Sequence, residues 1–141
     1  MSVKTYNAKD VLVIVGTKQL SGFGDEDIVS IKPNGEGFQT YVGADGDVGR
    51  STDPDETAEI TITLATTSAS NDYLSTLYNL DRKTGKGMIP IAIKDLSGST
   101  LCTASQAWIV NFPEVKKGKS ISTNEWVFHT GQANFFVGGN D

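Results

Sequence analysis

The sequence predicts a single, mainly β domain: a β-sandwich or barrel with one flanking α-helix and a long β-hairpin arm. Strand-like runs with two-residue alternation recur from one end of the chain to the other, and the helical period occurs in one segment only. Between two of the strand-like runs, residues 43–56 form a long polar connection rich in Gly and Asp. These observations predict the sheets, the helix and the arm in turn.

Length and composition limit the domain and its partners. The chain has 141 residues, the usual size of one domain, so we expect residues 1–141 to share one core. Twelve Lys and Arg against 17 Asp and Glu give a net charge of −5, which weighs against a basic nucleic-acid interface. A single Cys102 allows no intramolecular disulfide, and the apolar run Val11–Val15 is too short for a membrane anchor.

The first half of the chain predicts strands separated by Gly-rich and acidic joints. Residues 10–16 contain a continuous apolar run, and residues 27–33 and 37–43 follow as further strand-like segments. In residues 57–65 the alternation is complete. One face of that strand carries Ala58, Ile60, Ile62 and Leu64, and the opposite face carries Glu59, Thr61 and Thr63. We therefore expect one face to lie in the core and the other to meet water.

The second half begins with the helix. Leu74, Leu77 and neighbouring aromatic residues recur at helical spacing after Ser and Asn capping residues, which predicts a helix over residues 70–82 that ends near Gly85. Residues 87–95 then alternate again as a strand. The final two strand-like runs, residues 99–113 and 122–138, are joined by a basic, glycine-containing turn at residues 114–121.

Catalytic chemistry has little support in the sequence. Nucleophilic triads, dyads and zinc sites need several His or Cys residues close together, and this chain has one of each. His129 lies in a strand-like run, where a structural or solvent-facing role is favoured, and Cys102 is expected to be a small buried hydrophobe. We expect no catalytic residue and no cofactor.

Calcium and carbohydrate binding remain open as alternatives. Asp45, Asp47, Asp53, Asp55 and Glu56 gather oxygen ligands of the kind that Ca²⁺ takes, but their spacing departs from the EF-hand loop after the opening Asp-Gly-Asp. A solvated acidic loop is therefore favoured, with no metal. The pair of Trp residues, at 108 and 126, suggests a sugar platform, yet both lie inside apolar strands, where a core role is commoner.

The polar connection is best explained by a protein partner. Unstructured connections of this length are uncommon in compact domains unless they are functional or disordered. We expect an arm at 43–56 that becomes ordered against an adjoining subunit through Ala44, Asp45, Asp47, Val48, Arg50, Asp53 and Asp55. If copies of the chain join edge to edge, the polar strand face with Glu59, Thr61 and Thr63 would line a water-filled space.

The order of these elements resembles that of the tail tube proteins of contractile-tailed bacteriophages. The resemblance is carried by the opening residues 5–33, the hairpin region 35–51, the strand-to-helix passage 61–79 and the closing residues 126–139. It implies a non-enzymatic structural protein of the virion, assembled in the host cytoplasm. Six copies would form a ring, and stacked rings would form a hollow tube through which DNA passes without specific binding.

The resemblance also implies the partners of such a tube, namely a sheath protein, a tape-measure protein and a baseplate. A type VI secretion or pyocin-like tube is the alternative within the same architecture. From a different class, a calcium- or carbohydrate-binding β-sandwich module remains open, and an enzyme comes third.

Overall fold

The computed structural model describes residues 3–140, so the ends of the expected domain, residues 1–2 and 141, lie outside the described residues. The elements follow one another as η1 (Ala8–Asp10), β1 (Val11–Val15), β2 (Lys18–Gln19), β3 (Val29–Pro33), β4 (Phe38–Val42), β5 (Val48–Thr52), β6 (Ala58–Ala65), α1 (Ser70–Thr84), β7 (Ile89–Asp95), β8 (Leu101–Asn111), β9 (Thr123–Thr130) and β10 (Ala133–Phe136). Strands dominate, and the predicted mainly β fold with one flanking helix is confirmed.

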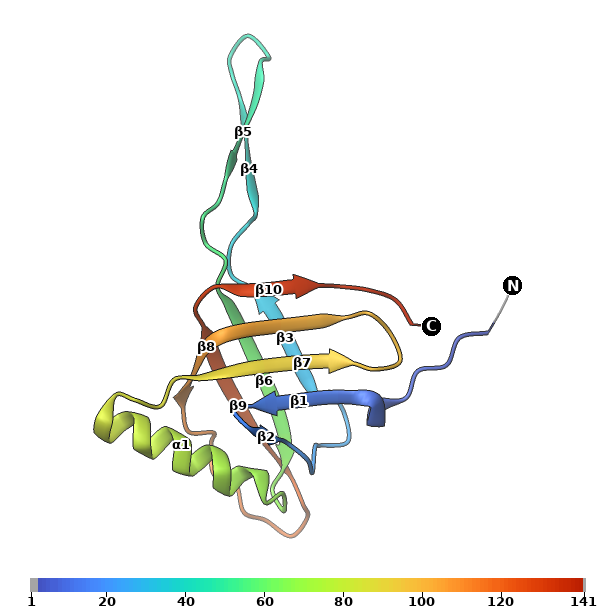
Figure 1. Cartoon of the computed structure of the whole chain (residues 1–141), viewed down its shortest axis with the longest axis vertical. Helices are drawn as coiled ribbons and strands as arrows, with labels where there is room; N and C mark the ends of the chain where they lie inside the picture. Colours follow the sequence, from blue (N-terminus) through green and yellow to red (C-terminus); the bar gives the residue numbers. More distant parts are fainter. Residues whose placement is uncertain (1–2, 141) are drawn as a thin grey trace.

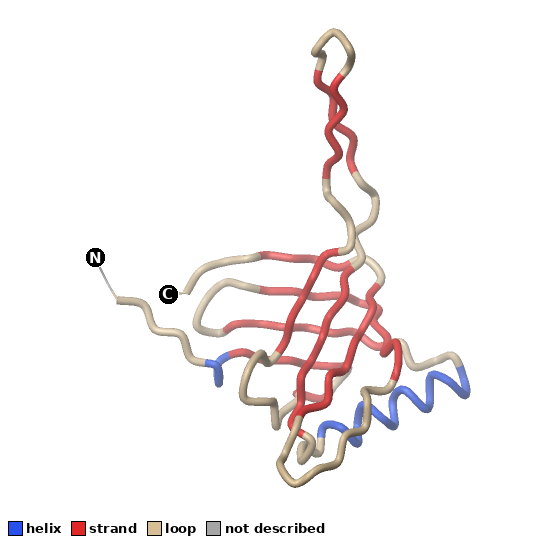
Figure 2. The backbone as a smooth tube through the Cα atoms, turned by 180° about the vertical axis from the view of Figure 1, so that it is seen from behind, coloured by secondary structure: helices blue, strands red, loops and turns tan. Residues whose placement is uncertain are grey.

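The body consists of two strand layers that cross one another (Figures 1 and 2). The strands are hydrogen-bonded in the order β2-β1-β7-β8-β9-β6-β3, and β10 also pairs with β8. The first part of β8 pairs with β10 through Leu101–Ala104, and its second part pairs with β9 from Ala107 onward. Because β8 belongs to both layers, it closes the body along one side, as in a sandwich or partly open barrel.

The core lies between the two layers and follows the predicted alternation. Ala58, Ile60, Ile62 and Leu64 of β6 are fully buried, while the residues between them are half-buried. Trp126 and Phe128 of β9 are the largest fully buried side chains. These apolar faces account for most of the stabilisation, since burying one such side chain contributes roughly 1.5–3 kcal/mol.

Helix α1 covers one end of the body (Figure 2). It begins at Ser70, as predicted, and continues two residues beyond the predicted end at Arg82. Gly85 adopts a left-handed backbone (φ 69°) and donates its N–H to the Asp81 carbonyl at 2.7 Å, which ends the helix. Leu74 is fully buried, and the Tyr73 hydroxyl donates to the Val15 carbonyl at 3.0 Å, so the helix is fixed to β1.

A two-stranded hairpin projects from the body and contacts neither layer along its length (Figure 1). The sequence places the arm at 43–56, and in the structure the projecting hairpin spans 38–52. Its first strand, β4, therefore precedes the expected range, and residues 53–56 lie in the neck. No helix among residues 3–140 has the length and apolar character needed to cross a membrane.

Candidate assembly surface

The tip of the arm is a tight turn organised by its own acidic residues. Strands β4 and β5 pair from Phe38↔Thr52 to Val42↔Val48. Beyond the last pair, the Gly43 N–H donates to the Asp47 carbonyl at 2.7 Å, and the Asp45 carboxylate accepts the Asp47 N–H at 3.2 Å. The Asp-Gly-Asp sequence that suggested a cation ligand thus makes a local turn.

The neck of the arm is held by a second set of carboxylate contacts. The Asp53 N–H donates to the Gly37 carbonyl at 2.7 Å, which brings the two ends of the hairpin together. The Asp53 carboxylate accepts the N–H groups of Asp55 and Glu36, at 2.9 and 3.0 Å, and these donors hold the pKa of Asp53 below its ordinary value of 3.8. Asp55 in turn accepts the N–H and hydroxyl of Thr57.

The arm exposes apolar side chains along its whole length. Tyr41 and Val48 are 73% and 72% exposed, and Phe38 and Val42 are also largely exposed. The Arg50 guanidinium stacks over the Phe38 ring at 4.4 Å from the ring centre, so its charge lies beside an apolar surface. A free-standing ribbon with this composition has the features of a contact surface.

The predicted arm residues fall into three places. Ala44, Asp45 and Asp47 form the turn, Val48 and Arg50 belong to β5, and Asp53 and Asp55 lie in the neck. The expected arm at 43–56 left out β4, because residues 37–43 have the pattern of an ordinary body strand, although the hairpin region 35–51 named for the family resemblance includes it. Gly residues on both sides of that segment were the available signal, since they allow a ribbon to leave the body.

The three predicted lumen residues lie side by side on the outer face of β6. Glu59 is opposite His129 on β9 and Lys32 on β3, so this carboxylate has one cationic neighbour, Lys32. Thr63 lies at the other end, opposite Glu125. There the face continues into a groove of about 370 Å³ whose lining includes Asp25, Glu26, Asp27 and Glu125. The acidic character of the face is therefore concentrated near Thr63 rather than at Glu59.

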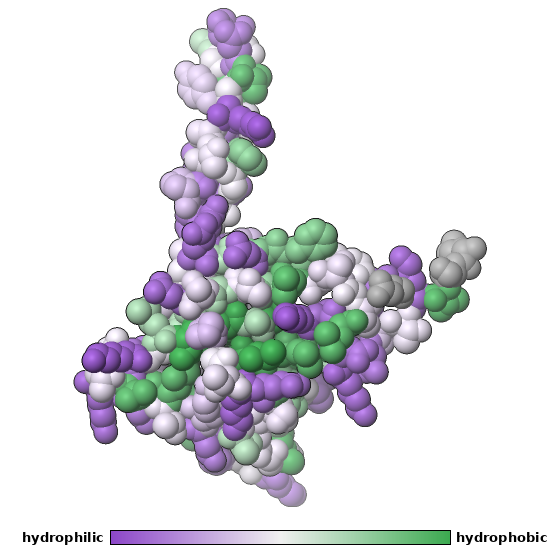
Figure 3. Space-filling model, viewed as in Figure 1, coloured by the Kyte–Doolittle hydropathy of each residue, from purple (hydrophilic) through white to green (hydrophobic). Residues whose placement is uncertain are grey.

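The opposite layer also has an exposed outer face, on which apolar side chains gather (Figure 3). Register aligns Leu12, Lys94, Leu101 and Phe136 across β1, β7, β8 and β10. Phe136 is 60% exposed, and the adjoining Val137 is 85% exposed. The isolated chain therefore presents apolar surface on the body as well as on the arm.

Residues considered for other functions have structural roles here. Trp126 is buried and its indole N–H donates to the Asn71 side chain at 2.9 Å, whereas Trp108 is half-buried on the outer face opposite His129. Burial raises the pKa of the Cys102 thiol, so it resists ionisation. Within residues 3–140, no three His, Cys, Asp or Glu side chains gather as metal ligands would.

Comparison of the sequence with known proteins gives two consistent findings. The family model described as the bacteriophage PhiTE tail tube protein matches residues 5–138. Structural protein ORF10 of Pseudomonas phage KPP10 is 33% identical over 144 residues, covering 96% of this chain and 83% of the phage protein.

Solved structures show the same fold in contractile injection systems. A chain of the sheath-tube complex of the extracellular system PVC, in its extended state, superposes with a TM-score of 0.63 at 12% identity, covering 97% of this chain and 93% of that chain. A chain of the PVC sheath/tube terminator superposes with a TM-score of 0.65 at 11% identity, covering 97% and 100%. The cap that terminates the anti-feeding prophage tube gives a TM-score of 0.60 at 13% identity, covering 97% and 95%.

Proposed function

The chain belongs to the bacteriophage PhiTE tail tube protein family, and on that premise we propose that it assembles into stacked hexameric rings that form a hollow conduit for DNA ejection. The family is one of structural proteins, and this chain is accordingly a structural component of a phage particle. In the assembled tail we expect it to contact a sheath protein, a tape-measure protein and a baseplate. Assembly would take place in the host cytoplasm.

The observation that carries the proposal is the free-standing arm. Within residues 38–52 every side chain is exposed, including Phe38, Tyr41 and Val48. A ribbon that leaves the body with its apolar residues in water gains nothing for the subunit itself, because it adds no core contact. Contact with a neighbouring copy would cover these side chains and explain why the chain maintains the ribbon.

The two outer faces of the body support the same assembly. The apolar face, with Leu101 and Phe136, is suited to contact between neighbours within a ring. The polar face, with Glu59, Thr61 and Thr63, is suited to the lumen, because Thr hydroxyls bind water and carboxylates repel DNA phosphates. The acidic groove beside Thr63 adds to that repulsion.

The direct test is negative-stain electron microscopy of the purified protein at high concentration, with mass photometry of diluted samples. We expect rings with an open centre and, at higher concentration, hollow rods built from them. A protein that stays monomeric at every concentration, with and without a pre-formed tube end to extend, would contradict the proposal.

A second conduit function has one observation in its favour. The fold is shared with chains of an extracellular contractile injection system. The conduit of this chain would then carry protein rather than DNA. Identification of the molecule inside intact particles, by nuclease and protease protection, separates the two functions.

A further inference from the structure

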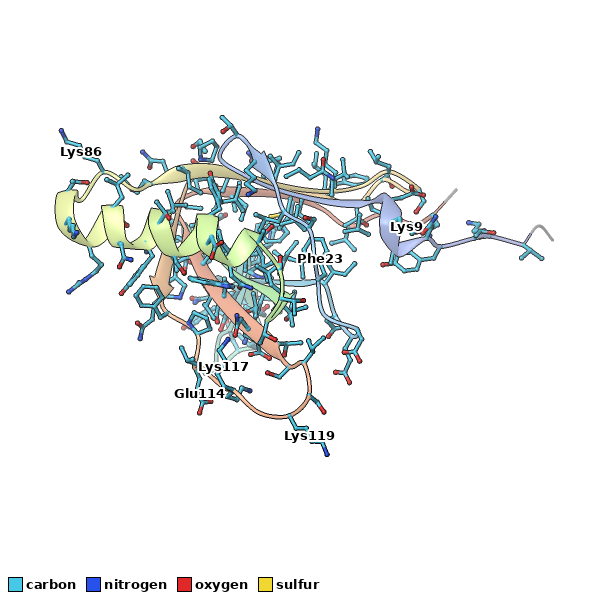
Figure 4. The ribbon with its side chains drawn as sticks, turned by 90° about the horizontal axis from the view of Figure 1, so that it is seen from below. Lys9, Phe23, Lys86, Glu114, Lys117 and Lys119 are labelled. Atoms are coloured by element: carbon cyan, nitrogen blue, oxygen red, sulfur yellow. The ribbon has the colours of Figure 1, made fainter. Side chains whose placement is uncertain are left out.

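The tip of the arm and one loop at the far end of the subunit carry opposite charge. The turn at the tip of the arm, residues 43–47, contains Asp45 and Asp47 and no Lys or Arg. The loop between β8 and β9 lies at the other end of the molecule, on the side away from the arm (Figures 1 and 4). Residues 114–121 of that loop include Lys116, Lys117 and Lys119 and a single acid, Glu114.

The basic loop also borders a recess whose lining is partly apolar and partly polar. A groove of about 240 Å³ runs between the loop and the first turns of α1. Its lining includes the apolar side chains Phe112 and Val115, the two cations Lys116 and Lys117, and one acid, Asp72. Val115 is 79% exposed, so this recess lacks a cover in the isolated subunit. On the arm, the cross-strand pair Val42 and Val48 lies directly next to the acidic turn.

A larger groove at the same end is excluded by its charge. It measures about 660 Å³ and its lining includes Asp25, Glu26 and Asp27, with Lys9 as the one basic residue. An arm tip with two carboxylates would be repelled there, since like charges at close range cost free energy. Charge therefore selects the smaller, basic recess as the receptor.

We propose that the acidic arm tip of one subunit docks on the 114–121 loop of a subunit in the next ring, with Asp45 and Asp47 against Lys116 and Lys117. The Val42 and Val48 side chains then cover the recess beside Val115. The inference rests on the proposed function and names the receptor that the arm requires. Because donor and receptor lie at opposite ends of the chain, the contact is head-to-tail and repeats from ring to ring.

The test is a charge-reversal cycle scored by rod formation. We expect Asp45→Lys with Asp47→Lys, or Lys116→Glu with Lys117→Glu, to leave rings intact and to raise the concentration needed for rods by about tenfold or more. Combining all four changes in one chain should restore rods. Raising the salt should weaken wild-type stacking and leave ring formation less affected.

The matched control is Lys83→Glu with Lys86→Glu, which changes the net charge equally at the C-terminal end of α1, where Lys86 lies far from the loop (Figure 4). This control should stack like the wild type. If the wild type stacks while both reversals also stack, or if the fourfold variant is not rescued, the receptor assignment is wrong and the tube function stands. If the wild type forms neither rings nor rods, the proposed function fails and this inference fails with it.

Discussion

Removal of the arm should leave the chain able to fold but prevent its rings from stacking. The structure indicates where to cut, because the Asp53 N–H already donates to the Gly37 carbonyl at 2.7 Å. Replacing residues 38–52 with Asn-Gly between Gly37 and Asp53 therefore leaves the neck closed by a two-residue turn. Rings should form and rods should not, because the arm tip that reaches the next ring is absent.

The expected effect on stability is small and can be worked out from burial. Every residue of β4 and β5 is exposed, so the deletion removes no core contact. The connection between β3 and β6 becomes roughly half as long, which lowers its closure cost by about 0.6 kcal/mol. We expect the free energy of unfolding to change by no more than about 1 kcal/mol, or the Tm by about 4 °C.

Calorimetry and electron microscopy of the same preparation provide the assay. A variant that loses its cooperative melting transition would show that the arm is part of the folding unit. Rods formed at the wild-type concentration would show that the arm does not carry stacking. Pro54→Ala alters the neck without shortening the hairpin, and as a control it should still stack.

Three further predictions concern the body and the neck. Trp126→Ala should lower the free energy of unfolding, measured by denaturant titration, by roughly 3–5 kcal/mol. The change empties a fully buried site and leaves the Asn71 side chain without the indole donor. A loss below about 1 kcal/mol would contradict this packing. Glu59→Lys should permit assembly but slow DNA ejection measured from reconstituted particles, and unchanged ejection would remove Glu59 from the lumen. The pKa of the Asp53 carboxyl, measured by NMR, should lie below 3.8. Because the folded state depresses this pKa, the stability that the Asp53 carboxylate gives to the neck is present above the unfolded pKa. That stability is lost as the pH falls through the folded pKa.

The body of the fold was predictable because its elements have strong local periods. The alternation of residues 57–65 fixed which side chains of β6 are buried, and the burial of Ile60, Ile62 and Leu64 follows it. The helix start at Ser70 was predictable for the same reason, from a change of period. Its end at Thr84, two residues after the last residue expected in it, is set by the left-handed backbone of Gly85.

The arm and the distribution of charge were harder to predict. Strand β5 contains Gly49, Arg50 and Ser51 and has no apolar alternation, so its pairing with β4 depends on cross-strand contacts that sequence alone does not reveal. The neighbours of Glu59 likewise come from register, since Lys32 and His129 are distant from it in sequence. The receptor loop was visible only as a basic turn, because its position opposite the arm depends on the whole fold.

The slender arm also affects how readily free subunits would bind to one another. An isolated two-stranded hairpin is marginally stable in water, and this one is supported along its length chiefly by the Arg50–Phe38 stack and its pinched neck. A neighbouring subunit can bind the arm only when β4 and β5 are paired. The apparent affinity of a free subunit for the next ring is therefore reduced by the fraction of time that its arm is unpaired. In the proposed assembly, the arm would therefore limit spontaneous polymerisation. A more rigid turn in place of residues 43–47 would keep the hairpin paired for more of the time and lower the subunit concentration at which rods form.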